Sequence, residues 1–237
     1  MKKPYVICHM VMSIDGKVTG EFLNKTHHDI YYQINRDYNA DAYACGRVTM
    51  EGSFTNGYYP NLDEYDPVGN YEDYIVREKS GFYALAFDPH GRLGWMSNHI
   101  IDVDEDPGYD NAQIIEVLTH QVDARYLGYL RSMGISYVFG GAESINVKEA
   151  LIKLSQYYNI NKILLEGGSI INGAFMDEDL IDELSLVINP ITASDTDKPL
   201  FMKSHIIEFE LKELKQFENG VLWLNYIKKW KTWEERR

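Results

Sequence analysis

Cysteine is almost absent from this 237-residue chain, proline is sparse, and long hydrophobic runs are missing. Cys8 and Cys45 cannot build a disulfide framework, so we expect two buried, reduced thiols in a cytoplasmic protein. The longest apolar stretches, such as 5–12, are far shorter than the ~20 residues of a transmembrane helix. No secretory signal is expected either, because the first apolar segment ends in Asp15-Gly16 rather than in a small-residue cleavage site.

Basic side chains are also in short supply. The 23 Lys and Arg residues against 36 Asp and Glu residues give a formal net charge of −13. Such a surface repels phosphate backbones and anionic lipids, which argues against nucleic-acid or membrane partners. Hydrophobic residues make up 45% of the chain and charged residues 25%, as in ordinary globular proteins. We therefore expect a folded protein that binds any anionic ligand in a locally built site.

Short apolar runs alternate with segments of helical spacing, which predicts an α/β fold with a mostly parallel sheet. After residue 182 the predicted strands follow one another without helices, and Asn219-Gly220 is a hairpin signal because both residues tolerate positive φ. We expect antiparallel strands at that edge and a single domain over residues 1–237. The expected strands are 5–12, 42–45, 82–87, 114–118, 136–139, 162–165, 184–189, 206–215 and 221–229, and the expected helices are 29–38, 123–133, 146–157 and 170–178.

Two glycine pairs follow predicted strands and precede predicted helices. Glu166, Gly167-Gly168 and Ser169 form the sharper signal, because a helix N-terminus offers free N–H groups to a phosphate. A tight turn with Ser169 as N-cap explains the same residues equally well. Gly140-Gly141 form the second pair, and both turns should lie on the sheet edge where α/β proteins bind ligands. Neither pair has the spacing of the dinucleotide-binding fingerprint.

Three further clusters are weaker. Arg47, after the strand 42–45, could contact a phosphate or could be solvated. Asp15-Gly16 could present a carboxylate beside the first strand or form an ordinary turn. His27-His28 would not converge on a metal, and no further ligand has supporting spacing, so we predict no metal site. Serine hydrolase, zinc protease and P-loop motifs are not found in the sequence.

Five motifs occur in register along the chain: residues 12–17 (MSIDGK), 46–49 (GRVT), 165–173 (LEGGSIING), 180–184 (LIDEL) and 189–191 (NPI). In this order they resemble the pyrimidine reductase domain of riboflavin biosynthesis, in the stand-alone form without a deaminase domain. The resemblance implies a dihydrofolate-reductase-like fold, with three α/β/α layers, and a homodimer. It also implies that NADPH delivers a hydride to C1 of a ring-opened ribosylamine imine.

Site residues follow from the resemblance together with the residues themselves. Val11 would lie along the nicotinamide, and Glu166 would contact the pyrimidine. We take Asp15 as the first candidate for a catalytic acid and Glu166 as the second, because hydride transfer needs little other side-chain chemistry. The expected cofactor-binding set is Val11, Gly46, Arg47, Thr49, Gly140, Gly141, Gly167, Gly168, Ser169, Ile170, Ile171 and Asn172, and the expected substrate-binding set is Ser13, Asp15, Arg36 and Glu166.

One departure concerns the substrate. The family's Asp-Asp-Pro run and the arginine after it, which meets the substrate phosphate, are replaced here by residues 50–57 (MEGSFTNG). Arg36 or Lys25 could supply the lost charge. Two alternatives therefore stay open: a related reductase of a different imine or carbonyl compound, and a non-catalytic nucleotide-binding protein of the same fold.

Overall fold

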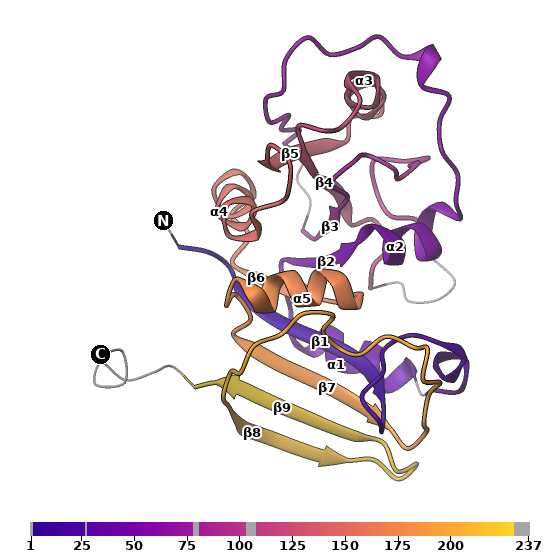
Figure 1. Cartoon of the computed structure of the whole chain (residues 1–237), viewed down its shortest axis with the longest axis vertical. Helices are drawn as coiled ribbons and strands as arrows, with labels where there is room; N and C mark the ends of the chain where they lie inside the picture. Colours follow the sequence, from indigo (N-terminus) through magenta and orange to yellow (C-terminus); the bar gives the residue numbers. More distant parts are fainter. Residues whose placement is uncertain (1, 27, 78–80, 103–107, 230–237) are drawn as a thin grey trace.

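The computed structural model describes residues 2–26, 28–77, 81–102 and 108–229. Its centre is one nine-stranded sheet in the order β5-β4-β3-β2-β6-β1-β7-β9-β8 (Figure 1). Strands β1 to β7 are parallel, and β9 and β8 join as antiparallel strands beside β7. The strands are β1 Tyr5–Ser13, β2 Ala42–Gly46, β3 Tyr83–Phe87, β4 Gln113–Thr119, β5 Ser136–Gly141, β6 Lys162–Leu165, β7 Glu183–Asn189, β8 Phe209–Gln216 and β9 Leu222–Lys228.

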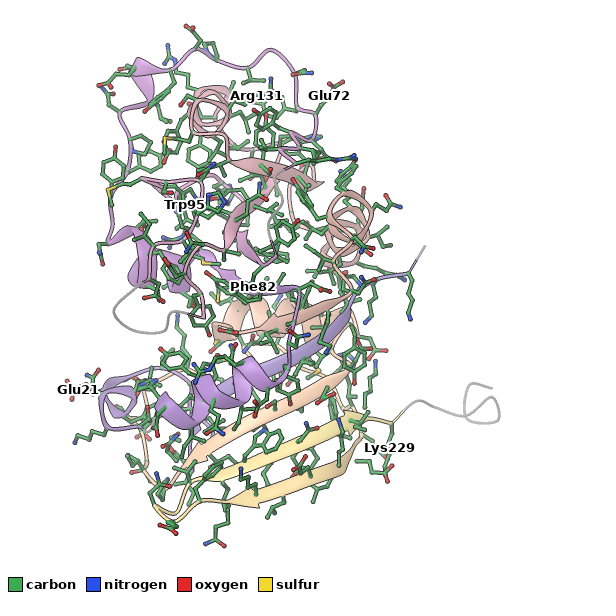
Figure 2. The ribbon with its side chains drawn as sticks, turned by 180° about the vertical axis from the view of Figure 1, so that it is seen from behind. Glu21, Glu72, Phe82, Trp95, Arg131 and Lys229 are labelled. Atoms are coloured by element: carbon green, nitrogen blue, oxygen red, sulfur yellow. The ribbon has the colours of Figure 1, made fainter. Side chains whose placement is uncertain are left out.

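Helices cover both faces of the sheet. In Figure 1 α5 lies in front of the strands, and the view from behind in Figure 2 shows α1 crossing the opposite face. The α-helices are α1 His28–Asp37, α2 Arg47–Met50, α3 Ala124–Ser132, α4 Val147–Tyr158 and α5 Ser169–Asp177. Short turns of 3₁₀-helix occupy Glu21–Lys25 and Leu62–Glu64, and a π-helical turn follows α2 at Glu51–Thr55. The expected α/β fold, a mostly parallel sheet with antiparallel edge strands and helices on both faces, is confirmed.

Alternate residues of the central strands pack into different cores. Cys8 and Met10 of β1 belong to the core beneath α4 and α5, whereas Val11 packs against α1. A third cluster lies beneath α3 and includes the fully buried Tyr126 and Leu130. Strands buried on both faces read as continuous apolar runs, which is why the parallel sheet could be predicted.

Strand β6 creates the feature that positions the site. It lies between β1 and β2, but its last pairs are with Cys8 of β1 and Ala44 of β2. Strand β1 continues to Ser13 on its other side, where it pairs with β7. The sheet therefore opens between β1 and β2 at its carboxyl edge. The connection after β2 leads to β3 on one side, and the connection after β6 leads to β7 on the other side. This is therefore a topological switch point, the usual ligand crevice of an open α/β sheet.

The hairpin β8–β9 forms as predicted, but its turn differs from the expected one. Phe217 N donates to Val221 O over 2.9 Å, and Gly220 N donates to Phe217 O over 3.0 Å. Gly220 has φ +82°, whereas Asn219 is not among the residues with positive φ. One left-handed residue after a tight turn gives a longer hairpin loop, so Gly220 alone carries the unusual conformation. Residues 56–77 form a largely irregular excursion, which an isolated bridge between Tyr74 and Tyr137 joins to β5. None of the helices in the described part of the chain is long and apolar enough to cross a membrane.

Candidate functional site

The glycine turn after β6 closes against the end of β2. Gly46 N donates to Gly167 O over 2.7 Å, and Glu166 N donates to Ala44 O over 2.9 Å. Gly167 has φ +88°, and a Cβ there would lie 2.9 Å from Cε of Met10. Its conformation therefore favours glycine, whereas the flexible end of Met10 could move aside for a β-carbon. The peptide bond between Gly167 and Gly168 is cis.

Gly168 has a different role, because a side chain would fit there. Its φ is −77°, and an added Cβ would meet only Thr49 Oγ1, at 3.6 Å. Gly168 is the N-cap of α5, and no side-chain cap bond to this helix is found within the described residues. The N–H groups of the first turn of α5 are thus left to an outside acceptor, in a concavity that a β-carbon would fill.

The second glycine pair does not share this arrangement. Gly140 and Gly141 lie on the same edge, but at the end of β5, with β4, β3 and β2 between them and β6. Added Cβ atoms would lie 2.9 Å from Ile145 and 2.2 Å from Ser144 O. The helix that follows, α4, is capped: Asn146 accepts from Glu149 N, and Glu178 accepts from Val147 N and Lys148 N. Close packing explains this pair, and the structure does not bring it to the turn at Gly167.

Glu166 points to the opposite face of the sheet, toward α1. Asn35 Nδ2 lies 2.5 Å from Glu166 Oε1, and Tyr109 Oη lies 2.5 Å from Glu166 Oε2. The Asn35 amide also donates to Tyr109 Oη over 2.9 Å, which closes a triangle of three side chains. Two donors fix the plane of the carboxyl group, and both come from segments far from β6 in sequence.

Aromatic side chains surround this triangle. Tyr43 packs edge-on against Tyr109 with ring centroids 4.7 Å apart, and Tyr31 stacks on His9 at 4.2 Å. Burial, together with the Glu166 charge, raises the pKa of Tyr109 well above its usual value. Burial likewise raises the pKa of the Cys45 thiol. Tyr109 and Cys45 are therefore neutral at physiological pH.

Asp15 lies in an exposed turn after β1 instead of in the crevice. Its Oδ1 accepts from Ala193 N over 3.0 Å. Hydrogen bonding from Ser13 and from the Ala193 amide lowers the pKa of Asp15, so it is ionised at neutral pH. Asp15 therefore lies apart from the polar cluster around Glu166 and stays a predicted, untested catalytic acid.

Two predicted substrate residues also lie elsewhere. Ser13 is fully buried, and its Oγ accepts from Lys17 N over 2.9 Å, so it closes the turn instead of facing a ligand. Arg36 is on the exposed side of α1, whereas its neighbour Asn35 points inward. Arg47 is partly buried and forms a 2.5 Å ion pair with Glu51 one helical turn later.

The remaining predicted cofactor residues divide into packed and open positions. Val11 packs under α1, Ser169 donates to Pro199 O over 2.5 Å, and Asn172 donates to Leu200 O over 3.2 Å. Ile171 is largely buried, but Ile170 is exposed. Ile14 and Val48, which begin the segments after β1 and β2, are exposed aliphatic residues as well. Apolar side chains thus flank the crevice beside polar main-chain groups, a mixture typical of small-molecule sites.

Comparison with known proteins relates part of this chain to a known family. Residues 109–223 match the family model of the RibD C-terminal domain. This stretch of the chain is similar to that domain family. The predicted resemblance to the riboflavin-biosynthesis pyrimidine reductases is confirmed.

Solved structures agree with this RibD-type fold. A pyrimidine reductase-like protein from Corynebacterium diphtheriae is 17% identical, with a TM-score of 0.70 over 96% of this chain and 93% of that one. RibD from Acinetobacter baumannii is 18% identical, with a TM-score of 0.66 over 96% of this chain and 59% of that one. A riboflavin biosynthesis reductase from Saccharomyces cerevisiae is 13% identical, with a TM-score of 0.64 over 96% and 90%. At these identities the structures show a shared fold.

Sequence reasoning about this RibD-type domain missed Asn35 and Tyr109. Helical spacing places Asn35 next to Ile34 on the buried face of α1, and a buried amide in an amphipathic helix is the signal that could have found it. Tyr109 follows the third strand in an irregular segment, and no local pattern ties it to Glu166. No group of three metal-ligating side chains is found where the chain is described, and His27 lies outside those residues.

Proposed function

We propose that this protein is an NADPH-dependent reductase of the 5-amino-6-(5-phosphoribosylamino)uracil reductase type. The uncapped N-terminus of α5 behind Gly168, at the crevice between β1 and β2, carries the proposal. The family match supports it. Free, buried Cys8 and Cys45 agree with a reducing compartment, and we propose the cytoplasm.

The residues around Gly168 fit a dinucleotide. Gly168 leaves room that a β-carbon would occupy, and Thr49 provides a hydroxyl 3.6 Å from that point. The buried Asn172 Oδ1 has no hydrogen-bond partner among the described residues. The α5 amides and Thr49 would hold the diphosphate, and Ile14, Val48 and Ile170 would cover apolar parts of the cofactor. When bound, the nicotinamide supplies a hydride to C1 of the substrate imine.

The chain's own residues would orient the substrate and control its protonation. Glu166 would contact the pyrimidine side and, when protonated at either oxygen, would favour the iminium form of the substrate. Asn35 and Tyr109 hold that carboxyl group in one plane through their 2.5 Å contacts. The tyrosines around Glu166 exclude water, which strengthens polar contacts inside the crevice.

A turnover assay tests the proposal. The protein is mixed with NADPH and the phosphoribosylamino-uracil, and absorbance of the reduced nicotinamide is followed. We expect substrate-dependent loss of that absorbance. A flat trace with cofactor bound would favour the second candidate below, and no thermal shift with NADPH or NADP would favour a non-catalytic protein. A ligand at 100 times its dissociation constant should stabilise the fold by about 2.7 kcal/mol.

A related reductase of a different imine or carbonyl compound is the second candidate. Its support is the missing phosphate-binding arginine, for which Arg36, exposed on the outer side of α1, is poorly placed to substitute. The two candidates differ in one measurable respect. If the second candidate is correct, a substrate without a phosphate group is reduced faster than the phosphorylated uracil compound.

We further propose that the protein is a homodimer. Leu211 and Leu214 lie on one face of the edge strand β8, opposite Tyr226 and Leu224 of β9. Both leucines are exposed, and the nearby Ile206 is 97% exposed. Contiguous exposed apolar residues on an edge strand are characteristic of an association surface. A second copy would cover them, and NADPH, the substrate and this copy are the partners we propose.

A further inference from the structure

A cavity of about 170 Å³ lies between α1 and the β8–β9 hairpin. Strands β1 and β7 separate it from β6, which carries the proposed active site. Gln33 and Asp37 of α1 and Tyr38, which directly follows this helix, line the cavity on one side. Lys212, Glu213 and Trp223 line it from the hairpin. Nothing in the proposed reaction uses these residues.

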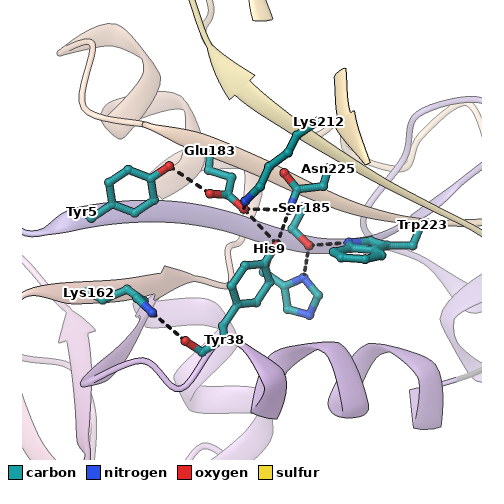
Figure 3. Close-up of polar contacts among 9 residues, drawn as sticks. All are labelled: Tyr5, His9, Tyr38, Lys162, Glu183, Ser185, Lys212, Trp223 and Asn225. Atoms are coloured by element: carbon teal, nitrogen blue, oxygen red, sulfur yellow. Dashed lines mark hydrogen bonds and ion pairs between the residues drawn. The ribbon is translucent and has the colours of Figure 1, made fainter. Parts of the chain in front are cut away.

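A buried carboxylate, Glu183 of β7, lies beside this cavity. The Glu183 side chain is 3% exposed. Tyr5 Oη donates to its Oε2 over 2.9 Å, and Oε1 accepts from Tyr38 Oη at 3.2 Å and from Asn225 Nδ2 at 2.7 Å. Figure 3 shows these groups around the carboxylate, with Asn225 between Glu183 and Trp223. Three neutral donors thus hold a negative charge in place.

Asn225 presents an unused acceptor in this cavity. Its amide orientation is fixed, because Nδ2 must donate to the Glu183 carboxylate, which cannot donate in return. Oδ1 of Asn225 then has no hydrogen-bond partner within the described chain, although the residue is only 2% exposed. A buried acceptor without a partner is unfavourable. Asn225 lines the cavity, and its Oδ1 lies just beneath the cavity surface, where a small shift of the side chains would expose it to a ligand.

Lys212 shows which chemical group suits these acceptors. The ladder between β8 and β9 shifts register between Leu211 and Glu213, which inserts Lys212 as an additional residue. A bulge of this kind redirects a side chain, and Lys212 Nζ lies 3.8 Å from Glu183 Oε1 (Figure 3). That separation is longer than a hydrogen bond, and the Lys212 side chain is 48% exposed. A mobile ammonium group therefore approaches the carboxylate from solvent without engaging it fully.

We propose that this cavity binds a small organic primary ammonium ion. The ligand's ammonium group would take the place of Lys212 Nζ, donating to Asn225 Oδ1 and Glu183 Oε1. Its apolar part would lie against Trp223, whose indole is fixed by a 2.8 Å bond from Nε1 to Ser185 Oγ. Asp37 and Glu213 add acceptors at the rim. A protein of net charge −13 also concentrates organic cations near its surface.

Three probes of one shape test the charge requirement. Benzylamine, benzyl alcohol and benzoate are titrated into the full-length protein at low salt, with binding followed by calorimetry and by the NMR chemical shifts of the protein. We expect saturable binding of benzylamine, with shifts confined to Trp223 and its neighbours, and at least tenfold weaker binding of the other two. Equal binding of benzoate, or no saturable binding of benzylamine, would overturn the proposal.

A variant with higher benzylamine affinity would distinguish a ligand site at Glu183 from a purely structural ion pair between Lys212 and Glu183. Lys212→Met removes the competing ammonium but leaves Glu183 its three neutral donors, so we expect benzylamine to bind at least fivefold more tightly. Lys148→Met is the matched control, because it removes the same charge at an exposed position of α4. It should alter the benzylamine affinity less than twofold. Unchanged or weaker binding by Lys212→Met would show that Lys212 does not occupy the ammonium position.

Discussion

Glu166 is the residue on which the proposed chemistry depends. The protein positions its carboxyl group with the buried Asn35 and with Tyr109, whereas Asp15 lies in an exposed turn. From this contrast we propose Glu166, the second candidate from sequence, as the catalytic acid instead of Asp15. The motif around Asp15 reads equally as a turn or as a site, and only the three-dimensional position of its neighbours decides between them.

Substitution of the two carboxylates tests this assignment. We expect Glu166→Gln to lower turnover by on the order of 100-fold, the usual size of an acid–base contribution, while NADPH affinity stays within twofold. Asp15→Asn is the matched change and should lower turnover less than threefold. Steady-state kinetics and a cofactor titration measure both. A strong loss of activity in Asp15→Asn with normal Glu166→Gln would reverse the roles.

A second residue-scale prediction concerns Glu116. This carboxyl group is fully buried near Asp88 and accepts from Trp95 Nε1 over 2.5 Å, and its Oε2 has no partner among the described residues. Burial, then repulsion from Asp88, raises the pKa of Glu116 well above 4.5. The folded state therefore holds a proton that the unfolded state releases, so stability falls as pH rises above about 4.5.

Glu116→Gln removes that linkage. The glutamine is neutral at every pH, so we expect it to raise the free energy of unfolding at pH 8 by on the order of 1–3 kcal/mol, with the gain shrinking toward pH 5. Urea denaturation at both pH values measures this. Glu218→Gln, the same change at an exposed position, should have no such pH-dependent effect. A destabilised Glu116→Gln at pH 8 would show that Glu116 is ionised in the fold.

Among the elements, the helices at the carboxyl edge are distinguished by their first turns. Helix α4 is capped by Asn146 and Glu178, whereas α5 begins at Gly168 with no side-chain cap bond among the described residues. A capped helix end serves stability, and an uncapped one leaves amides for a ligand. This difference separates the two glycine turns, which the sequence motifs alone left equivalent.

Removal of the α4 cap should affect stability alone. Glu178→Ala leaves two first-turn amides without their carboxylate acceptor, and we expect a loss of about 1 kcal/mol in the free energy of unfolding. NADPH affinity should not change, because α4 is at the other end of the sheet edge. Denaturant melts and cofactor titrations of the variant test both parts. Weakened NADPH binding would mean that the second glycine turn also belongs to the cofactor site.

Strands and helices were predictable because their patterns are local. Strand β6 begins and ends as expected, and all four expected helices form within about one residue of their predicted bounds. The position of β6 between β1 and β2, the bulge at Lys212 and the contact of Tyr109 with Glu166 were not predictable. Each joins segments far apart in sequence, and the physical cause lies in tertiary packing instead of in local spacing.

At the scale of the whole molecule, the exposed leucines of β8 predict self-association. Leu214→Lys places a charge in the proposed contact, and we expect the variant to sediment as a monomer while the wild type sediments as a dimer. Its fold should persist, because Leu214 is exposed. Analytical ultracentrifugation distinguishes the two states. A wild type that is monomeric at micromolar concentration would remove the homodimer from the account.

The whole account depends on a dinucleotide held at the mouth between β1 and β2 by main-chain amides of α5. Calorimetric titration of NADPH into the wild type and into Gly168→Val tests this most directly, with Gly52→Ala as the control because a Cβ at Gly52 meets no atom within 4 Å. We predict one saturable NADPH site in the wild type and in Gly52→Ala, and at least tenfold weaker binding in a folded Gly168→Val. Equal affinity in Gly168→Val, or no NADPH binding by the wild type, would contradict the account.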